Sequence, residues 1–545
     1  MGMYLNPGTA SFTEAVNSKI FIDKTQMISF LNSLVKTKQK YVSVSRPRRF
    51  GKTMAADMIC AYYGRETDAA SLFAGLKLAK HEKWDSFLGK FDVLRLNIID
   101  FLTDSAKISE MLSFLTEEVT RELLREYPDV QYGSRLNLRI VMSKIYAETG
   151  HQFVIVIDEW DAVFREYPND LDGQKLYLDF LRDWLKDKEY VALAYITGIL
   201  PIKKYGKHSA LNMFDEYSMI YPMQLAQYAG FTEEEVQGLC TAYGRDFAQL
   251  KVWYDGYKVT DITPPDPNHE ILKATGESPK AAQYSLYSPL SVVKAVQTGQ
   301  ILNYWNNTET YEALEKYISM NYDGLKETIV MLMNGGKQAI DISGYQNDMT
   351  SFRNRDDILT MLIHLGYLSF DQGEVFIPNR EVLDVFKTST RDDSWRPVFR
   401  LLENSQRLLE ATWAEDGITV AALLEEAHLA AGTHGYHSEE GLSFSIQLAY
   451  YNAVNYYTLF PELPTGKGYA DKVYIPKPEY ADKPVLLIEL KYKDSVESAI
   501  SQIHNRQYPK GLEAYKGNIL LVGINYERDS KRDDYKRHTC VIERA

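Results

Sequence analysis

The stretch that most constrains the fold is Ser45–Thr53, with the sequence Ser-Arg-Pro-Arg-Arg-Phe-Gly-Lys-Thr. Residues 40–44 before it predict a short buried strand, and residues 54–59 after it predict the start of a helix. A strand, a tight loop ending in Gly-Lys-Thr and a helix form the context of a phosphate-binding loop. Backbone N–H groups of such a loop surround a polyphosphate, and the helix directs the positive end of its dipole at the same charge.

The last two residues of this loop have separate predicted roles. Lys52 would reach the outer phosphates, and the Thr53 hydroxyl would hold Mg²⁺. The usual pattern has glycine where this chain has Arg46, and Pro47 stiffens the loop. The alternative is a basic turn that caps an ordinary helix, and Gly-Lys-Thr alone does not separate the two. The predicted nucleotide-binding residues of the loop are Arg46, Pro47, Arg48, Arg49, Phe50, Gly51, Lys52 and Thr53.

A second predicted strand ends in two carboxylates. Residues 153–157 are apolar and rich in β-branched side chains, and Asp158 and Glu159 follow them. A continuous apolar run is typical of a strand buried on both faces of a parallel sheet, and open α/β sheets bind ligands at the C-terminal ends of such strands. We therefore predict that Asp158 binds Mg²⁺ through water and that Glu159 polarises an attacking water. Thr197 ends another apolar strand, where it would either sense the outermost phosphate or form an ordinary turn.

Composition narrows the class of protein. A chain of 545 residues is too long for one core, so about three domains are expected. The apolar fraction of 45% and the charged fraction of 25% are those of ordinary globular proteins. A polar N-terminus and the absence of membrane-length apolar runs predict a cytoplasmic protein without a membrane partner. The scattered cysteines Cys60, Cys240 and Cys540 fit a reducing compartment, with neither a disulfide framework nor a metal cluster.

The distribution of charge and of apolar residues suggests how the chain is divided. The net charge of −13 argues against non-specific coating of nucleic acid but leaves room for a local basic site. Residues 466–545 contain 15 Lys and Arg against 12 Asp and Glu, a net charge of +3, which leaves −16 for the rest. Strands alternating with helices over residues 40–200 predict a parallel, right-handed α/β domain. Residues 301–425 have helical spacing, with a short strand pair predicted near residues 367–377.

Motifs in the first half of the chain carry a family resemblance. They lie at residues 21–25, 45–53, 157–161 and 197–199. Together they resemble the bacterial AAA-ATPase-like family, whose members often carry a C-terminal PD-(D/E)XK nuclease domain. The phosphate loop of that family itself has the sequence Arg-Pro-Arg-Arg-Phe-Gly-Lys, so Arg46 agrees with the resemblance. Asp23 is predicted to cap a helix or a turn, and the alternative is that Asp23 and Lys24 pack near the nucleotide.

The last segment has a different pattern. A helix is predicted from Glu439 to Phe460, and strands are predicted at residues 466–476 and 484–493. A further helix over residues 495–511 and a final apolar strand over residues 518–524 complete the segment. The order helix, strand, strand, helix, strand resembles the PD-(D/E)XK nuclease core.

Charged residues of this segment predict a metal site. Asp471 would come from one strand of a hairpin, while Glu489 and Lys491, two residues apart, share a face of the next strand. Asp471 and Glu489 would hold one or two Mg²⁺ ions that generate hydroxide, and Lys491 would orient the water or balance charge. Tyr469 replaces an arginine of the resembled family. Three further residues are predicted to support this site: Gln502, Tyr508 and Glu462.

These observations predict an α/β fold in three parts: a P-loop parallel-sheet ATPase domain at residues 1–225, a mostly helical connecting domain at 226–435 and an α/β PD-(D/E)XK nuclease-like domain at 436–545. The predicted function is ATP binding with hydrolysis, coupled to Mg²⁺-dependent cleavage of nucleic acid, with DNA favoured over RNA. One alternative is an ATP-driven regulatory switch whose nuclease-like domain only binds nucleic acid or a protein partner. Another is a structural module that binds nucleotide without turnover. A homo-oligomer is left open, with Arg165 and Arg182 as candidates for a trans-acting arginine.

Overall fold

The chain forms two compact units. The computed structural model describes residues 2–65, 68–202, 211–228, 230–261, 282–305, 311–320, 322, 324–333, 335–391, 395–430, 446, 449–465, 468–492, 495–506, 512, 517–527 and 538–545. The first unit contains Met1–Thr328 and Lys337–Ser389, and the second contains Ile329–Gly336 and Thr390–Ala545. The domain boundaries predicted after residues 225 and 435 remain predictions.

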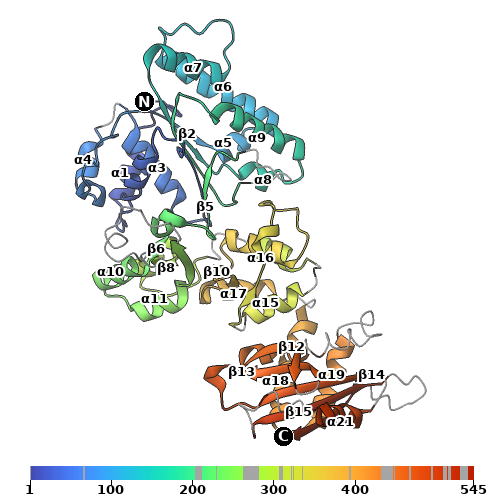
Figure 1. The fold of residues 1–545 in the computed structure, drawn as a ribbon. Helices are drawn as coiled ribbons and strands as arrows, with labels where there is room; N and C mark the ends of the chain where they lie inside the picture. The colour runs from blue at the N-terminus through green and yellow to red at the C-terminus, as the bar shows by residue number, and fades with distance from the viewer. Residues whose placement is uncertain are drawn as a thin grey trace, which may run out of the picture. The chain divides into compact units, whose positions relative to one another are not determined.

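The first unit is built on a parallel sheet with strand order β2-β3-β4-β1-β5 (Figure 1). Its strands are β1 (Tyr41–Ser45), β2 (Asp92–Asn97), β3 (Phe153–Asp158), β4 (Val191–Gly198) and β5 (Asp215–Tyr217). Every residue of β1, β3 and β4 is buried, as expected for strands that are covered on both faces. The predicted parallel α/β architecture is therefore confirmed.

Helices cover both faces of this sheet (Figure 1). One face packs against α6 (Ile108–Glu126), α7 (Leu138–Thr149) and α9 (Leu171–Leu185). The other face packs against α1 (Ala10–Val16), α2 (Met27–Leu34), α3 (Lys52–Tyr63) and α4 (Ala70–Ala74). Successive strand residues alternate between the two cores, so Leu94 and Leu96 face one side and Val93 faces the other. The short helices α5 (Ile98–Thr103) and α8 (Ala162–Glu166) follow β2 and β3 directly.

The rest of the first unit is mostly helical, as predicted. Its elements are η2 (Met223–Tyr228), β6 (Phe231–Thr232), α10 (Glu233–Tyr243), α11 (Phe247–Tyr254), β7 (Tyr257–Asp261), β8 (Ala282–Tyr287), α13 (Pro289–Thr298), α14 (Tyr311–Ile318), α16 (Arg355–Leu365), β10 (Ser369–Asp371), β11 (Glu374–Phe376) and α17 (Arg380–Ser389). A capping box between Thr232 and Glu235 starts α10. Gly256 has φ +114°, and a Cβ there would collide with the carbonyl group of Pro378. Strands β10 and β11 form the strand pair predicted near residues 367–377.

The second unit contains a mixed sheet with strand order β12-β13-β14-β15-β16. The elements are α18 (Arg396–Trp413), α19 (Gly417–Ala430), η5 (Tyr451–Asn455), β12 (Tyr457–Thr465), β13 (Gly468–Pro476), β14 (Val485–Tyr492), α21 (Val496–Arg506), β15 (Ile519–Tyr526) and β16 (His538–Arg544). Strands β14 and β15 pair in parallel, and the other neighbouring strands pair antiparallel. Helices α18 and α19 pack on one face of this sheet, and α21 packs on the other.

The helix predicted from Glu439 to Phe460 is wrong at its C-terminal end. Strand β12 begins at Tyr457 and pairs with β13 over most of its length. Residues 457–460 are Tyr-Thr-Leu-Phe, which are β-formers, and the following prolines Pro461 and Pro464 cannot donate hydrogen bonds to a neighbouring strand. An edge strand tolerates such prolines, and β12 is the edge of this sheet. Residues 439–445, 447 and 448 lie outside the described part of the chain.

Among the described residues, none of the helices combines the length and the apolar character that a membrane crossing requires.

One buried carboxylate ties the helical part of the first unit together. Glu381 on α17 is fully buried and accepts hydrogen bonds from the backbone N–H groups of Tyr304 (2.7 Å) and Trp305 (3.0 Å). The Ser291 hydroxyl on α13 also donates to it, at 2.8 Å. Burial raises the pKa of Glu381 from 4.5 to about 7, against the opposing effects of these donors and of the nearby Arg49 guanidinium.

We expect Glu381 to make the stability of the first unit depend on pH. Its pKa is higher in the folded state than in the unfolded state, so between pH 4.5 and 7 the folded state binds more protons. The free energy of unfolding should therefore fall as the pH rises through this range, by at most about 1.4 kcal/mol per pH unit from this group. Glu381→Gln should remove this contribution. Urea unfolding of both proteins from pH 5 to 8 measures the difference, and parallel curves would contradict the assignment.

Candidate functional site

The register of the parallel sheet brings the predicted phosphate loop and the predicted carboxylates to one edge. Ser45 at the end of β1 pairs with Gly198 at the end of β4, and Thr197 pairs with Asp158 at the end of β3. Because parallel strands end at the same edge of the sheet, the loop after β1 lies beside Asp158. The polar residues predicted from separate stretches of sequence therefore share one neighbourhood.

The loop adopts a conformation that needs its glycine. Gly51 has φ +82°, and a Cβ there would meet open space, so backbone conformation alone requires glycine at this position. Arg49 also has a positive φ, of 65°, which is uncommon for a residue with a side chain and is typical of functional loops. The Phe50 ring is buried and packs edge-on against Tyr257, with 5.2 Å between ring centroids.

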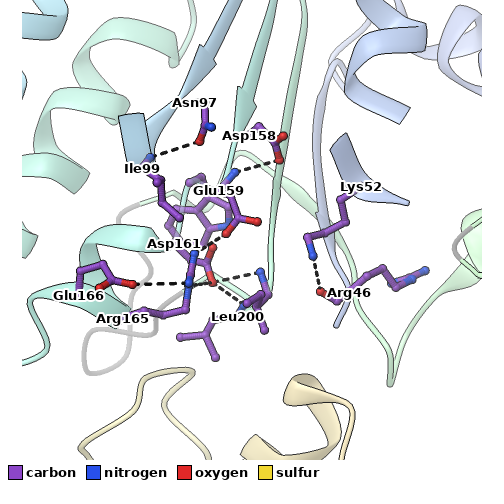
Figure 2. Close-up of polar contacts among 12 residues, drawn as sticks. Arg46, Lys52, Asn97, Ile99, Asp158, Glu159, Asp161, Arg165, Glu166 and Leu200 are labelled. Carbon is purple, nitrogen blue, oxygen red and sulfur yellow. Dashed lines mark hydrogen bonds and ion pairs between the residues drawn. The ribbon is translucent and has the colours of Figure 1, made fainter. Parts of the chain in front are cut away.

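Lys52 opens α3 and turns back over the loop. Its Nζ donates hydrogen bonds to the backbone carbonyls of Arg46 (3.0 Å) and Pro47 (2.9 Å), and Figure 2 shows the side chain directed at Arg46. Burial lowers the pKa of Lys52, while the carboxylates of Glu159 and its neighbours oppose this effect. The ammonium therefore lies between the loop backbone and the acidic end of β3.

The Arg46 side chain points into the core of the first unit, and its predicted part in nucleotide binding stays a prediction. Its guanidinium is fully buried, where Nη1 donates to the carbonyls of Ser45 (2.9 Å) and Tyr217 (2.7 Å) and Nη2 approaches the Leu225 carbonyl at 3.5 Å. Burial lowers the pKa of Arg46 to about 10, so the side chain remains charged at neutral pH. The side chain anchors β5 and η2 from inside the core, and Arg46 is not part of the lining of the cavity beside the loop.

Asp158 lies at the centre of a polar cluster. It is buried, accepts a hydrogen bond from the Glu159 N–H at 3.0 Å, and lies 3.8 Å from Nη2 of Arg95. Burial raises the pKa of Asp158, against a hydrogen bond with the Thr53 hydroxyl and the charges of Arg95 and Lys52. The hydroxyl and carboxylate that were predicted to share Mg²⁺ therefore interact electrostatically, and oxygen ligands of this kind suit that ion.

Glu159 has an arginine partner within the same chain. Its backbone φ is 52°, and its carboxylate forms an ion pair with Nη2 of Arg165 on α8 (Figure 2). Arg165 Nε also donates to Asp161 at 3.2 Å, and its side chain is only 5% exposed. Burial raises the pKa of Glu159, with Arg165 as the largest opposing charge. Arg182, the other candidate for a trans-acting arginine, lies exposed on α9 and pairs with Asp179 at 2.7 Å.

A cavity of about 690 Å³ adjoins the loop. Its volume falls in the range of small-molecule sites. Predicted residues in its lining are Arg48, Arg49, Phe50, Gly51, Lys52, Thr53 and Glu159. Asp158 and Thr197 are buried behind this wall, in the pairing register of β3 and β4.

Much of the cavity wall is apolar and was not singled out from the sequence. The apolar residues of the lining include Phe12, Phe21, Met54, Met58, Pro289 and Leu290. Met54 and Met58 lie four residues apart on the helix that Lys52 begins, a spacing that places them on one helical face. That spacing is the signal that could have identified them, whereas Pro289 and Leu290 come from a distant segment and depend on the tertiary fold.

The Asp-Lys-Thr motif at residues 23–25 contains a turn residue, Asp23, and a lysine that lines the cavity, Lys24. Asp23 Oδ1 accepts a hydrogen bond from the Thr25 N–H at 2.9 Å, and Asp23 Oδ2 accepts one from the Lys77 N–H at 2.6 Å, so Asp23 is a turn residue. Lys24 points elsewhere: it lines the cavity and forms a 2.6 Å ion pair with Glu235. The motif thus fixes a turn on one side and contributes a cation to the cavity on the other.

A second polar cluster lies on β13 and β14 of the C-terminal unit. The register that pairs Lys472 with Ile488 aligns Asp471 with Glu489 one residue further on. Asp471 Oδ2 accepts a hydrogen bond from the Leu490 N–H at 2.7 Å. The side chain of Asp471 therefore reaches β14 at the level of Glu489, and the hairpin brings the two carboxylates together.

Helix α21 adds to this cluster. Lys491 Nζ lies 3.3 Å from Glu489 Oε1 and donates to Gln502 Oε1 at 2.8 Å, while Gln502 Nε2 donates to Glu489. Glu489 is 1% exposed. Tyr508 and the side chains of Glu462 and Tyr469 lie outside the described part of the chain. Among the described residues, no three or more His, Cys, Asp or Glu side chains are arranged to hold a metal ion, so the donor set here is the carboxylate pair.

Two parts of the chain match family models. Residues 7–206 match the family model described as "Predicted AAA-ATPase", and residues 439–534 match the model described as "PD-(D/E)XK nuclease superfamily". Both resemblances that were found from sequence motifs are thereby confirmed. No curated protein matches the chain.

Several solved structures are also similar to the chain, at low identity. A Walker-type ATPase of Pyrococcus abyssi is 11% identical with a TM-score of 0.33, and the alignment covers 67% of this chain and 94% of that one. A signal transduction ATPase with numerous domains (STAND) from Pyrococcus horikoshii, which has a tetratricopeptide repeat sensor, is 13% identical with a TM-score of 0.26, covering 80% and 52%. The ORC2 protein of Aeropyrum pernix is 13% identical with a TM-score of 0.25, covering 67% and 91%.

We expect Arg46 to be a structural anchor of the first unit. Arg46→Ala would leave buried carbonyls of Tyr217 and Leu225 without this donor and would remove packing, at a cost of about 2–4 kcal/mol in the free energy of unfolding. Arg48 is an exposed residue of the same loop, and Arg48→Ala should change the free energy of unfolding by less than about 1 kcal/mol. Urea unfolding curves of the two variants measure these values, and equal effects would contradict the anchoring role.

Proposed function

We propose that the N-terminal region binds ATP with Mg²⁺ and hydrolyses it, and that the C-terminal domain is a Mg²⁺-dependent nuclease acting on DNA. The observation that carries the first half is the cavity bounded by Lys52, Thr53 and Glu159 beside the buried Asp158. The observation that carries the second half is the hydrogen-bonded contact of Glu489 with Lys491 and Gln502, next to Asp471.

In the proposed ATPase, each residue acts through its place around the cavity. Lys52 exchanges its loop carbonyls for the outer phosphate oxygens, which are stronger acceptors because they are charged. Thr53 and Asp158 would hold Mg²⁺, which when bound neutralises charge on the phosphates. Glu159 accepts a proton from the attacking water, and burial, which raises its pKa, makes it a stronger base for this role.

In the proposed nuclease, Asp471 and Glu489 would hold Mg²⁺, which when bound supplies a hydroxide nucleophile and a Lewis acid. Lys491 stabilises the negative charge that develops on the phosphate during attack. Gln502 holds both Glu489 and Lys491 and so fixes their relative position. The net positive charge of residues 466–545 supports a polyanionic substrate.

The proposal links the two activities, with ATP turnover controlling nucleic-acid cleavage. The regulatory switch remains the second candidate, since the same residues would still bind a nucleic acid or a protein partner without cutting. Cleavage assays with and without ATP separate the coupled nuclease from the regulatory switch. A coupled nuclease changes its cutting rate when nucleotide is added, whereas the switch does not cut.

Lys52→Ala should lower ATP turnover by about 10²-fold or more, because the variant loses the cation that faces the phosphates. Phosphate release under saturating Mg²⁺ measures the effect. Lys38→Ala, which removes an exposed lysine just before β1, is the matched control and should turn over at the wild-type rate. Unchanged turnover in Lys52→Ala would show that the measured hydrolysis does not come from this site.

Glu489→Gln should abolish Mg²⁺-dependent cleavage of plasmid, linear or single-stranded DNA, because the variant loses a charged metal ligand but keeps its shape. Glu497→Gln, an exposed position on α21, should cut like the wild type. RNA substrates in the same assay test the preference for DNA. DNA binding without cleavage by the wild-type chain in any divalent metal would instead favour the regulatory switch.

A further inference from the structure

The arginine partner of Glu159 comes from its own chain and is held from several sides. Arg165 lies on the one-turn helix α8, seven residues after Asp158, and both Arg165 and Glu159 line the nucleotide cavity. Its guanidinium contacts Glu159 through Nη2 and Asp161 through Nε, and Nη1 lies 3.8 Å from Glu166 (Figure 2). Its side chain is 5% exposed, so little of it is open to solvent.

Asp161 fixes this arginine to the end of β4. It is fully buried, and its Oδ2 accepts hydrogen bonds from the Ile199 N–H (3.0 Å) and the Leu200 N–H (2.8 Å) as well as from Arg165. Gly198 makes the close approach possible, because a Cβ there would collide with the Asp161 carboxylate. Asp161 therefore anchors Arg165 to the residues that follow Thr197 and Gly198 at the end of β4.

The backbone of Glu159 adopts an uncommon conformation beside Arg165. Glu159 has φ +52°, a region that a residue with a side chain enters only when its surroundings hold it there. Its carboxylate contacts Arg165 from α8, and the charge of Lys52 on α3 also lowers its pKa against the effect of burial. We expect Lys52 to bind the phosphates when nucleotide binds. Arg165 would then be the contact that keeps the Glu159 carboxylate at the cavity wall.

We propose that Arg165 is a positioning residue, acting in cis, that holds Glu159 in the orientation needed to accept a proton from the attacking water. This inference rests on the proposed ATPase function. Arg165 belongs to the same chain as the phosphate loop. Orienting the Glu159 carboxylate therefore needs no arginine from a second copy of the chain.

Steady-state ATP turnover of Arg165 variants and of a control variant tests the proposal. Arg165→Ala should lower kcat by about 10²-fold, the size of a general-base contribution, while KM and the Kd of a fluorescent ATP analogue change by less than about threefold. Arg165→Lys should recover part of the lost kcat, because lysine restores a positive charge beside Glu159. The recovery should be incomplete, because a single ammonium cannot contact Glu159 and Asp161 together as the guanidinium does. Arg121→Ala, an exposed arginine on α6, is the control and should match the wild type.

The decisive variant is the double substitution with Glu159→Gln. If Arg165 works through Glu159, then Arg165→Ala should cost little further activity in the Glu159→Gln background. Losses that multiply would overturn the proposal, as would a rise in KM with kcat unchanged, which would indicate a direct phosphate contact. Because Arg165 is buried, Arg165→Lys and Glu159→Gln keep the test valid if Arg165→Ala fails to fold.

Mixing two inactive chains tests the cis assignment. Arg165→Ala has an intact Lys52, and Lys52→Ala has an intact Arg165, so an arginine acting across a subunit interface would restore turnover in the mixture. The proposal predicts no restoration, and recovered activity would overturn it. A wild-type chain that binds ATP but shows no Lys52-dependent turnover would refute the proposed ATPase instead, which separates the two failures.

Discussion

The parallel pairing of β1, β4 and β3 is the constraint on which the proposed nucleotide site depends. The phosphate loop, Thr197 and Asp158 come from distant parts of the sequence and meet only because these strands end in register. A slip of one residue would move Asp158 by about 3.3 Å along the strand and turn it to the opposite face. Burial of these strands on both faces makes such a slip costly, so the apolar cores fix the position of the polar site.

The phosphate loop has Arg46 where the usual pattern has glycine, and contacts with the rest of the first unit stabilise it. Arg46 ties the loop to the core through backbone carbonyls, and Phe50 packs on Tyr257 from the helical part of the same unit. Gly366, whose carbonyl accepts the Tyr257 hydroxyl, approaches Pro47 so closely that a Cβ would not fit. The loop is therefore held by packing on two sides.

Residue patterns predicted the elements of the fold better than the directions of particular side chains. The positions of Gly51, Lys52 and Asp158 at one edge of the sheet were predictable. Each follows or ends an apolar run, and a buried strand ends where polar residues begin. The orientation of Arg46 was not, because no linear pattern says whether a loop side chain faces the ligand or the core. The cis contact of Arg165 depends on the turn of Glu159, which only the fold reveals. In the C-terminal unit, the aromatic residues after Tyr456 were assigned to a helix because their pairing partner in β13 is not local.

The most direct test of the nucleotide site is a crystal structure of the chain with Mg²⁺ and a non-hydrolysable ATP analogue. We expect Lys52 Nζ within about 3 Å of a terminal phosphate oxygen, in place of the Arg46 and Pro47 carbonyls. The metal should bind the Thr53 hydroxyl and approach Asp158, with Glu159 facing the terminal phosphate beside Arg165. An analogue bound outside this cavity, or Lys52 still bonded to the loop carbonyls with nucleotide present, would contradict the site.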